Sequence, residues 1–392
     1  MGKLALTQAA VITPFILIEE ATILVEDKII KAIGTTDSIE VPPEYREINL
    51  EGFIVAPGLI DQHLHGGGGA EIMNPTIDSF SEVSRFLATH GITSFLATTI
   101  TASIDELIAI AETYQKFKQL DYKGAKCLGL HLEGPYLSSD FAGVHSANSL
   151  RCPSVEEVIN LQQKSDRGIK MITLAPELPG AIGLISSLAC SGNIKFSVGH
   201  SNATYEETLA AITAGVVCAT HCFNQMRPLN HREPGVLGGV LTSESTYIEL
   251  IVDHQHLHEA IIKMIWKLKG AERIILVSDS MLPTGLTEGI YQTSVGEIHQ
   301  FNNRLTDSNG RLSGSNITLD KAVKYFWEIT GCELTDAFRL ATYNPAKMLG
   351  INKKKGSLYP GKDADLIVLN SDLDVVMTMV EGEVISGLIS ID

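Results

Sequence analysis

Eight short apolar runs recur along the middle of the chain, and each of them ends in polar residues. They cover residues 59–65, 93–99, 125–133, 170–176, 194–200, 216–221, 247–256 and 273–280. Runs of this length suit strands that are buried on both faces of a parallel sheet. Between several runs, Ser103, Ser154 and Thr204 each stand three residues before a glutamate, which is the capping-box signal of a helix start. Eight strands alternating with helices predict an α/β fold, a (β/α)8 TIM-like barrel.

The two ends of the chain have a different pattern, because short stretches of alternating apolar and polar residues are separated there by turn residues. This alternation is typical of antiparallel sheets. We therefore expect residues 1–57 and 351–392 to meet in one small β-sandwich domain, with a barrel of residues 58–350 between them. A polar insert at about 286–316, rich in turn residues, predicts a hairpin before the last helices.

Composition excludes some classes of partner. A formal net charge of -16 over 392 residues argues against nucleic acid and against an anionic membrane surface. An anionic small substrate is still compatible, since a few local Arg and His side chains can hold one phosphate. The N-terminal residues show neither a signal peptide nor a span of about 20 apolar residues.

The six cysteines are scattered without a disulfide framework, so free thiols in the cytoplasm are expected. Cys218 and Cys222 flank His221, and this spacing could suggest a thiolate zinc site. No second cysteine pair lies nearby in the sequence, which disfavours that interpretation.

Polar side chains gather where the predicted strands end, and active sites of barrels form at the C-terminal ends of their strands. These side chains are His63, His65, Glu133, His200, His221, His256 and Asp279. Each of them alone is more often a hydrogen-bonded histidine or a helix-capping carboxylate. Several together at one end of a barrel need a charged partner, and a metal ion supplies it. Two imidazoles and one carboxylate leave a fourth position open for water, which is the pattern of a catalytic metal site.

His63 and His65 end the first predicted strand, directly before the four glycines of 66–69. Side chains two apart on a strand point to the same side, so both imidazoles can converge on one ion. The glycines allow a sharp turn and leave open space beside the rings. The alternative interpretation is an edge strand with two surface histidines and a flexible loop.

A series of short motifs covers nearly the whole chain: PGLIDQHLHG, HLEGPY, GHSNA, THCFN, REPG, SDSM, GRLSGS, NPAKMLG and GSLYPGKDADLIVLN. The series resembles the amidohydrolase superfamily and, within it, the family of N-acetylglucosamine-6-phosphate deacetylases. The resemblance implies a barrel of the metal-dependent hydrolase type that uses a metal-activated water. The expected reaction converts N-acetyl-D-glucosamine 6-phosphate to D-glucosamine 6-phosphate and acetate.

The resemblance also implies roles for individual residues. Glu133, His200 and His221 are expected to hold the main metal. Asp279 is expected to take the proton from the activated water and to give it to the leaving amine. His145, in GVHSANSL, matches the family histidine that positions and polarises the substrate carbonyl.

A second group of family positions concerns the sugar phosphate. His256 and the backbone of Asn224 and Gln225 match groups that hold it. Arg232, in REPG, matches an arginine that reaches the phosphate in the neighbouring subunit's site, a role that suits its planar fork. The resemblance therefore implies a homodimer.

The number and identity of the metal ions are open at this point. Some family members have other residues in place of His63 and His65 and use one metal, so the two histidines leave room for a second ion, with Glu133 as the bridge. The fourth strand carries Lys170 at its start and no lysine placed for a carboxylated bridge. Zinc is expected first, and iron or manganese would suit the same ligands.

Three departures from the family pattern surround the expected sugar pocket: Gln225, His254 and Ser280 replace the usual Ala, Gly and Ala. The sequence therefore constrains the type of reaction more closely than the identity of the sugar. The alternative is a deacetylase of another N-acetylhexosamine 6-phosphate, such as the galactosamine epimer. Arg232 and His256 argue against a cyclic-amide hydrolase. A non-catalytic amidohydrolase-like scaffold is a further alternative, although such chains typically lose ligands.

Overall fold

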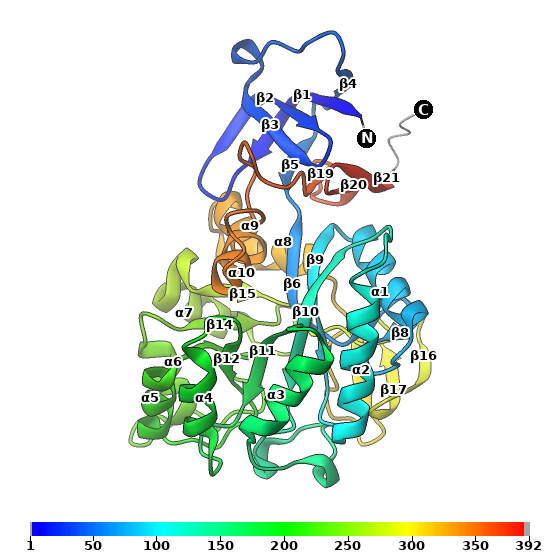
Figure 1. Ribbon diagram of the computed structural model, residues 1–392. Helices are drawn as coiled ribbons and strands as arrows, with labels where there is room; N and C mark the ends of the chain where they lie inside the picture. Colours follow the sequence, from blue (N-terminus) through cyan, green and yellow to red (C-terminus); the bar gives the residue numbers. More distant parts are fainter. Residues whose placement is uncertain (1, 388–392) are drawn as a thin grey trace.

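The larger part of the protein is a barrel of eight parallel strands. The computed structural model describes residues 2–387. The strands pair in the order β15-β14-β13-β12-β11-β10-β9-β6 (Figure 1). In chain order they are β6 (Leu59–Leu64), β9 (Ile92–Thr99), β10 (Lys126–Glu133), β11 (Ile169–Leu174), β12 (Lys195–Val198), β13 (Val216–Ala219), β14 (Tyr247–Leu250) and β15 (Ile274–Leu276).

Main-chain hydrogen bonds join the two edges of this sheet just beyond β15. The Asp279 N–H donates to His63 O at 2.9 Å, and the His65 N–H donates to Ser280 O at 2.8 Å. The predicted (β/α)8 fold is therefore confirmed. The run at 247–256 was expected to be a longer strand, but β14 ends at Leu250, since the chain beyond it turns towards His256.

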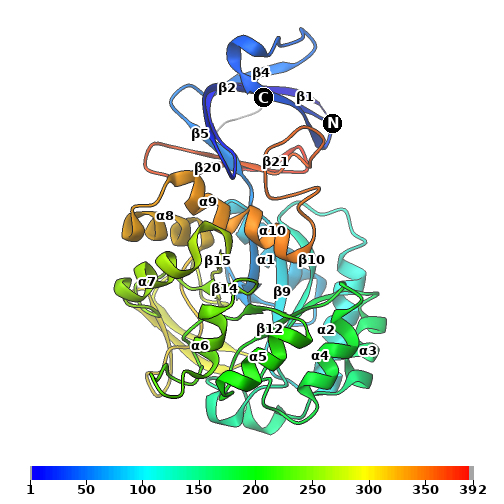
Figure 2. The ribbon, with the colours of Figure 1, turned by 90° about the vertical axis from the view of Figure 1, so that its left-hand side faces the viewer.

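Helices alternate with the barrel strands and cover the outside of the barrel (Figure 2). They are α1 (Ile77–Thr89), α2 (Ile104–Phe117), α3 (Val155–Lys164), α4 (Ala181–Ala189), α5 (Tyr205–Ala214), α6 (Gly235–Thr242), α7 (Glu259–Lys269), α8 (Leu319–Thr330), α9 (Leu334–Ala341) and α10 (Tyr343–Leu349). Short 3-10 turns are η1 (Thr36–Ser38), η2 (Ser139–Phe141), η3 (Ala147–Ser149) and η4 (Gly270–Glu272).

Two of the three predicted capping boxes are complete. Ser103 and Thr204 each cap a helix, and the glutamate three residues later returns the hydrogen bond. Ser154 caps α3, but Glu157 does not return the bond. The Glu157 carboxylate instead binds the guanidinium of Arg151 and the hydroxyl of Tyr136.

Both ends of the chain form one eight-stranded sheet around a core of its own. Its strands are β1 (Lys3–Ile12), β2 (Leu17–Glu26), β3 (Ile29–Thr35), β4 (Arg46–Asn49), β5 (Ile54–Pro57), β19 (Leu366–Leu369), β20 (Val375–Val380) and β21 (Glu383–Gly387). The sheet is not purely antiparallel, because β1 pairs in parallel with β4 along its first half and with β5 along its second. A bulge at Gln8, whose φ is 61°, separates the two halves. The domain boundaries at residues 57 and 350 stay predictions.

The polar insert contains three strands, so the prediction of a simple hairpin was wrong. β16 (Gly289–Thr293), β17 (Gly296–Phe301) and β18 (Arg304–Asp307) form an antiparallel sheet. Asn302 and Asn303 have φ of 52° and 57°, and this pair of left-handed residues makes the second tight turn. A further small pair, β7 (Gly66–Gly67) with β8 (Ala70–Glu71), lies beyond β6.

The small sheet and the C-terminal ends of the barrel strands lie at opposite ends of the protein. The chain leaves the small sheet at β5 and enters the barrel directly through β6 (Figure 1). Helices α8 to α10 lie between the small sheet and the barrel in both views (Figure 2). The barrel end that carries the predicted site residues is therefore free of the small sheet. Among the described helices, none has the length and apolar character needed to cross a membrane.

A buried ion pair joins the segment that follows α10 to the residues just before β19 of the small sheet. Lys355 Nζ, which is almost buried, lies 2.6 Å from Asp365 Oδ2 and 2.9 Å from Asp363 Oδ2. Asp365 Oδ1 also accepts a hydrogen bond from the Glu381 N–H at 2.8 Å. Removing one partner of such a pair leaves the other charge buried without compensation.

We therefore expect Lys355→Met to destabilise the protein by about 3 kcal/mol, because it keeps the alkyl stem and removes only the charge. Urea denaturation measures the free energy of unfolding. Lys353→Met is the matched control, since Lys353 is exposed two residues away, and it should change stability by less than about 0.5 kcal/mol. Equal effects of the two substitutions would contradict the importance of the buried pair.

Candidate metal centre

The predicted ligands come from the C-terminal ends of several barrel strands. His63 lies on β6, Glu133 is the last residue of β10, and the other candidates follow the ends of their strands within three residues. His200, His221 and Asp279 have φ of 49°, 28° and 51°. This left-handed backbone is uncommon for residues other than glycine and costs about 1–3 kcal/mol at each position. Strain is thus concentrated where the side chains turn towards one another.

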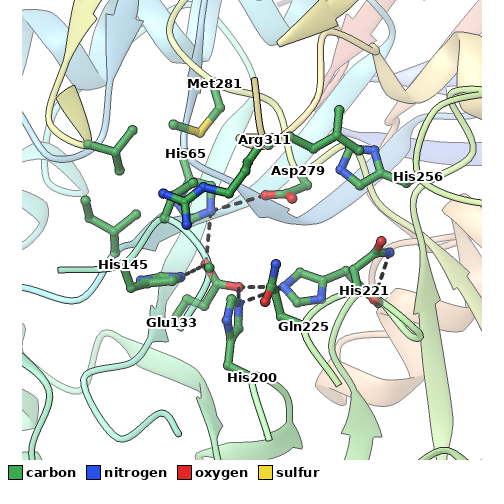
Figure 3. A pocket seen from close by; sticks show the side chains of 17 residues that line it. His65, Glu133, His145, His200, His221, Gln225, His256, Asp279, Met281 and Arg311 are labelled. Carbon is green, nitrogen blue, oxygen red and sulfur yellow. Dashed lines mark hydrogen bonds and ion pairs between the residues drawn. The ribbon is translucent and has the colours of Figure 1, made fainter. Parts of the chain in front are cut away.

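One oxygen of Glu133 faces two histidines (Figure 3). Glu133 Oε1 lies 3.2 Å from His200 Nε2 and 3.0 Å from His221 Nε2, and the two nitrogens are 3.0 Å apart. All three side chains are buried. We call this group the Oε1 subsite.

A second group of histidines lies beside Glu133 and Asp279. Glu133 Oε2 lies 3.2 Å from His65 Nε2, and His65 Nε2 also lies 3.2 Å from Asp279 Oδ1. His63 Nε2 lies 3.4 Å from Glu133 Oε1 and 3.6 Å from Asp279 Oδ1. His63, His65 and Glu133 together have the spacing of a metal-binding group. We call His63 and His65, with Glu133 as the shared carboxylate, the second subsite.

The hydrogen bonds of the Oε1 subsite show that it fits a cation. His200 Nδ1 lies 2.8 Å from Phe141 O, and a carbonyl only accepts, so Nδ1 carries the proton. Burial lowers the pKa of His200 to about 4, so its Nε2 bears a lone pair at neutral pH. That lone pair faces the carboxylate of Glu133 and Nε2 of His221. Ligands about 2.0–2.1 Å from a tetrahedral zinc ion lie about 3.3 Å apart, close to the observed spacing.

The second subsite holds protons that a cation can replace. His65 Nδ1 donates to Thr98 O at 3.2 Å, and His63 Nδ1 donates to Glu249 Oε2 at 3.1 Å. Burial disfavours the charged form of His65, but hydrogen bonds to Asp279 and Glu133 raise its pKa to about 9. Burial opposes the charged form of His63 too, yet the carboxylates of Glu133 and Glu249 hold its pKa well above the usual value. His63 Nε2 has no hydrogen-bond partner.

His145 has the opposite tautomer. The backbone N–H of Thr101 donates to His145 Nδ1 at 3.1 Å, so this nitrogen carries the lone pair. The proton therefore resides on His145 Nε2, which lies 3.3 Å from Glu133 Oε2. A nitrogen that carries a proton cannot bind a metal, although spacing alone groups His145 with Glu133 and His200. His145 is thus a hydrogen-bond donor that faces the pocket.

The two carboxylates of the centre are held ionised. Burial would raise the pKa of Glu133, but the charge of His63 and a hydrogen bond from His145 hold it well below its usual value. Burial acts on Asp279 in the same direction, while the hydrogen bond from His65 and the charges of His63 and His65 bring the pKa of Asp279 down to about 2. Asp279 is therefore able to accept a proton at neutral pH.

A cavity of about 270 Å³ opens beside these residues (Figure 3). Asn224, Gln225 and His256, which were predicted to hold the sugar phosphate, line it together with the metal-centre residues. Asp253 orients His256, because its Oδ2 accepts from His256 Nδ1 at 2.7 Å. The polar insert supplies one wall of the cavity through Val295, Arg311 and Leu312.

Of the predicted site residues, His63 and Arg232 do not line this cavity, and Arg232 is the exposed one of the two. It lies in an exposed loop, where its N–H donates to Asn230 Oδ1 at 2.9 Å. His63 also does not line the cavity, since its ring is buried behind His65 and Glu133. The exposed position of Arg232 leaves its side chain available to a second copy of the chain.

Two residues of the site were not predicted from the sequence. Arg311 lines the cavity and is the lining residue with a permanent positive charge. It belongs to the GRLSGS motif, but nothing in its surroundings in the sequence indicates a ligand. Glu249, the partner of His63, is an acidic residue inside an otherwise apolar strand, and that contrast is a signal that could have been used.

Comparison with known proteins gives a consistent result. The model of the amidohydrolase family matches residues 54–385. The N-acetylglucosamine-6-phosphate deacetylase of Vibrio furnissii is 36% identical over 90% of this chain and 88% of its own length. The N-acetylgalactosamine-6-phosphate deacetylase of Escherichia coli O157:H7 is 34% identical over 91% of this chain and 93% of its own length.

Solved structures agree with these relatives. A mutant N-acetyl-D-glucosamine-6-phosphate deacetylase from Mycobacterium smegmatis, in complex with N-acetyl-D-glucosamine-6-phosphate, superposes with a TM-score of 0.92 at 31% identity. The match covers 98% of this chain and 100% of that chain. The N-acetylglucosamine-6-phosphate deacetylase from Pasteurella multocida also has a TM-score of 0.92, at 32% identity over 97% and 99% of the two chains.

The tautomers lead to a direct prediction about metal content. We expect His200→Ala to reduce the bound divalent metal to less than half, because Nε2 of His200 is a ligand. His145→Ala, a matched change of a neighbouring buried ring, should keep the metal content, because Nε2 of His145 carries a proton. Elemental analysis of the purified variants measures the metal content of each. A loss of metal in His145→Ala alone would make His145, and not His200, the ligand.

Proposed function

Because the chain belongs to the amidohydrolase family, we propose that it hydrolyses the acetamide of N-acetyl-D-glucosamine 6-phosphate to D-glucosamine 6-phosphate and acetate. The curated relatives and the solved structures confirm the resemblance seen in the sequence, and they support an enzyme of amino sugar metabolism over a non-catalytic scaffold. The observation that carries the proposal is the cluster of buried histidine nitrogens around the Glu133 carboxylate, beside a cavity for the substrate.

The reaction exchanges one bond for another at the acetamide carbon. The oxygen of a water molecule bonds to the carbonyl carbon, the carbon–nitrogen bond breaks, and the amine leaves with a proton from that water. Glu133, His200 and His221 would hold a divalent cation, which supplies Lewis-acid chemistry and lowers the pKa of the water towards about 7. The water oxygen is the nucleophile, so no side chain of the described cavity is needed in that role.

Asp279 is the proposed proton carrier. Its carboxylate lies at the centre and is ionised at neutral pH, so it can accept the proton of the water. The same oxygen can then donate that proton to the nitrogen of the leaving amine. A single carboxylate thus serves first as base and then as acid.

His145 is proposed to orient and polarise the substrate carbonyl. The Thr101 N–H fixes its tautomer, so the proton on His145 Nε2 is directed into the pocket and not away from it. A hydrogen bond to the carbonyl oxygen stabilises the negative charge that develops there, and it needs no reorganisation of the ring.

The sugar phosphate would be held at the other side of the cavity. His256 is oriented by Asp253, and Asn224 and Gln225 line the same cavity. Arg232 of a neighbouring subunit would complete this site in a homodimer, since Arg232 lies in an exposed loop outside its own cavity. Arg311 of the same chain is a second candidate, because it lines the cavity and Asp307 holds its guanidinium at 2.9 Å.

Zinc is the cation that we propose first, because histidine and carboxylate ligands in a site with an open position suit it. Iron and manganese suit the same donors. The second subsite would bind a further ion, so one or two ions per chain are proposed.

All six cysteines are unpaired in the structure, and the proposed location is the cytoplasm, where thiols stay reduced.

Acetate release from the two N-acetylhexosamine 6-phosphates tests the reaction and the sugar together. We expect kcat/KM for the glucosamine substrate to exceed that for the galactosamine epimer by at least about ten-fold, because a site that binds one hydroxyl rejects the other. Asp279→Asn should lower kcat by about 100-fold or more while keeping the bound metal. Near wild-type turnover by Asp279→Asn would refute its role, and a reversed sugar preference would select the galactosamine alternative.

Mixed dimers test the phosphate site. We expect Arg232→Ala to raise KM by about ten-fold or more and to leave kcat nearly unchanged, because the lost contact is to a part of the substrate that does not react. In a dimer of one Arg232→Ala chain and one Asp279→Asn chain, the first chain keeps Asp279 and receives Arg232 from the second. Such mixed dimers should recover a low KM in that site. If only Arg311→Ala raised KM, the phosphate would be held within one chain.

A further inference from the structure

Glu249 is a fully buried carboxylate that the proposed reaction does not use. It lies on β14, in the interior of the barrel, and its side chain is 0% exposed. A carboxylate in such a position is costly unless several donors compensate its charge. The donors that surround Glu249 therefore indicate what it does.

Three groups contact Glu249, and two of them belong to the metal centre. Gln62 Nε2 donates to Glu249 Oε1 at 2.7 Å. His63 Nδ1 lies 3.1 Å from Glu249 Oε2, and the backbone N–H of His221 donates to the same oxygen at 3.3 Å. One buried oxygen thus contacts a histidine of each subsite.

Glu249 determines which nitrogen of His63 is available. Because the carboxylate only accepts, His63 Nδ1 carries a proton and His63 Nε2 is directed towards Glu133 and Asp279. The ring cannot easily turn away, since His131 packs edge-on against it with the ring centroids 4.8 Å apart. His131 itself has partners on both nitrogens, Gln62 O and Thr173 Oγ1, so it does not compete for Glu249.

The two histidines of the second subsite differ in the kind of group that accepts the proton of their Nδ1. His65 Nδ1 is held by a main-chain carbonyl, Thr98 O, and a substitution of the Thr98 side chain would not remove that carbonyl. His63 depends on a side chain, so only His63 can lose its orientation through one substitution. A histidine ligand whose other nitrogen is held by a carboxylate is oriented and made more basic, and loss of that carboxylate typically costs 10- to 100-fold in metal affinity.

We infer that Glu249 is a positioning residue that fixes His63 Nε2 towards the shared carboxylate and thereby sets the affinity of the second subsite for a divalent cation. The inference rests on the metal centre of the proposed function. It predicts that Glu249 governs the second ion of the pair and leaves the ion of the Oε1 subsite in place, because His200 is oriented independently by Phe141 O and Glu249 contacts only the main-chain N–H of His221, not its ring.

Stepwise titration of the metal-free protein with zinc, in competition with a chelator, measures the two affinities. The wild type should bind two ions per chain. Glu249→Ala should lower the weaker affinity by 10- to 100-fold or more and change the tighter one by less than about three-fold. Glu249→Gln keeps an acceptor for His63 Nδ1 in the same shape, so it should fold normally and show a smaller loss at the second subsite.

Glu177→Gln is the matched control. The Glu177 carboxylate accepts from Asn202 N and Ser201 Oγ in the loop after His200, and it does not contact His63 or His65. It should leave the affinity of the second ion unchanged. With cobalt in place of zinc, the visible absorption of the tighter site should be the same in the wild type and in both Glu249 variants.

Three outcomes would overturn the inference, and the first two are a wild type that holds a single ion at every concentration and Glu249 variants that bind both ions with unchanged affinities. Equal loss of both ions would instead assign Glu249 to the general architecture of the barrel and would also overturn it. These readouts do not depend on acetate release. A chain that binds two ions as described and hydrolyses neither sugar phosphate would refute the proposed function alone.

Discussion

The structure depends on the electrostatics of one buried carboxylate. Glu133 faces histidine nitrogens on both of its oxygens, one of them the unprotonated Nε2 of His200, and Asp279 adds a second negative charge 3.2 Å from His65. Lone pairs of this kind repel one another in a medium of low dielectric constant unless a cation lies between them. Protons partly fill this role in the second subsite, whereas the low pKa of His200 keeps a proton off its Nε2 in the Oε1 subsite. The centre is therefore built for a metal ion.

The barrel supplies the rigidity that such an arrangement requires. The ligands come from strands far apart in the sequence, and left-handed backbone at His200, His221 and Asp279 directs their side chains over the end of the barrel. Strain of about 1–3 kcal/mol at each of these residues persists only because the surrounding buried strands hold the backbone in place. Apart from His221, whose Nδ1 has no hydrogen-bond partner, the histidines of the centre are also oriented by their second nitrogen, and the identity of that partner separates ligands from donors. Phe141 O orients a ligand, whereas the Thr101 N–H orients His145 as a donor.

Much of this arrangement could be predicted from the sequence, because barrel strands are apolar and end in polar residues. The eight runs, the ligand candidates at their ends and the helix starts at Ser103 and Thr204 all follow from local patterns. The turn at Asn302 and Asn303 was overlooked, so the insert was predicted with too few strands. The tautomers could not be predicted, since they depend on main-chain groups such as Thr101 N–H that approach only in the folded barrel. Arg311 reaches the cavity through the packing of the insert, and no local pattern indicates that contact.

Crystals of the purified protein soaked with zinc would test the central claim most directly, through anomalous difference density measured at the zinc absorption edge. The account predicts a strong peak that shares Glu133 Oε1, His200 Nε2 and His221 Nε2 as ligands, with His145 Nε2 outside the coordination shell. Absence of density between these three atoms at saturating zinc, or coordination of the ion through His145, would contradict it.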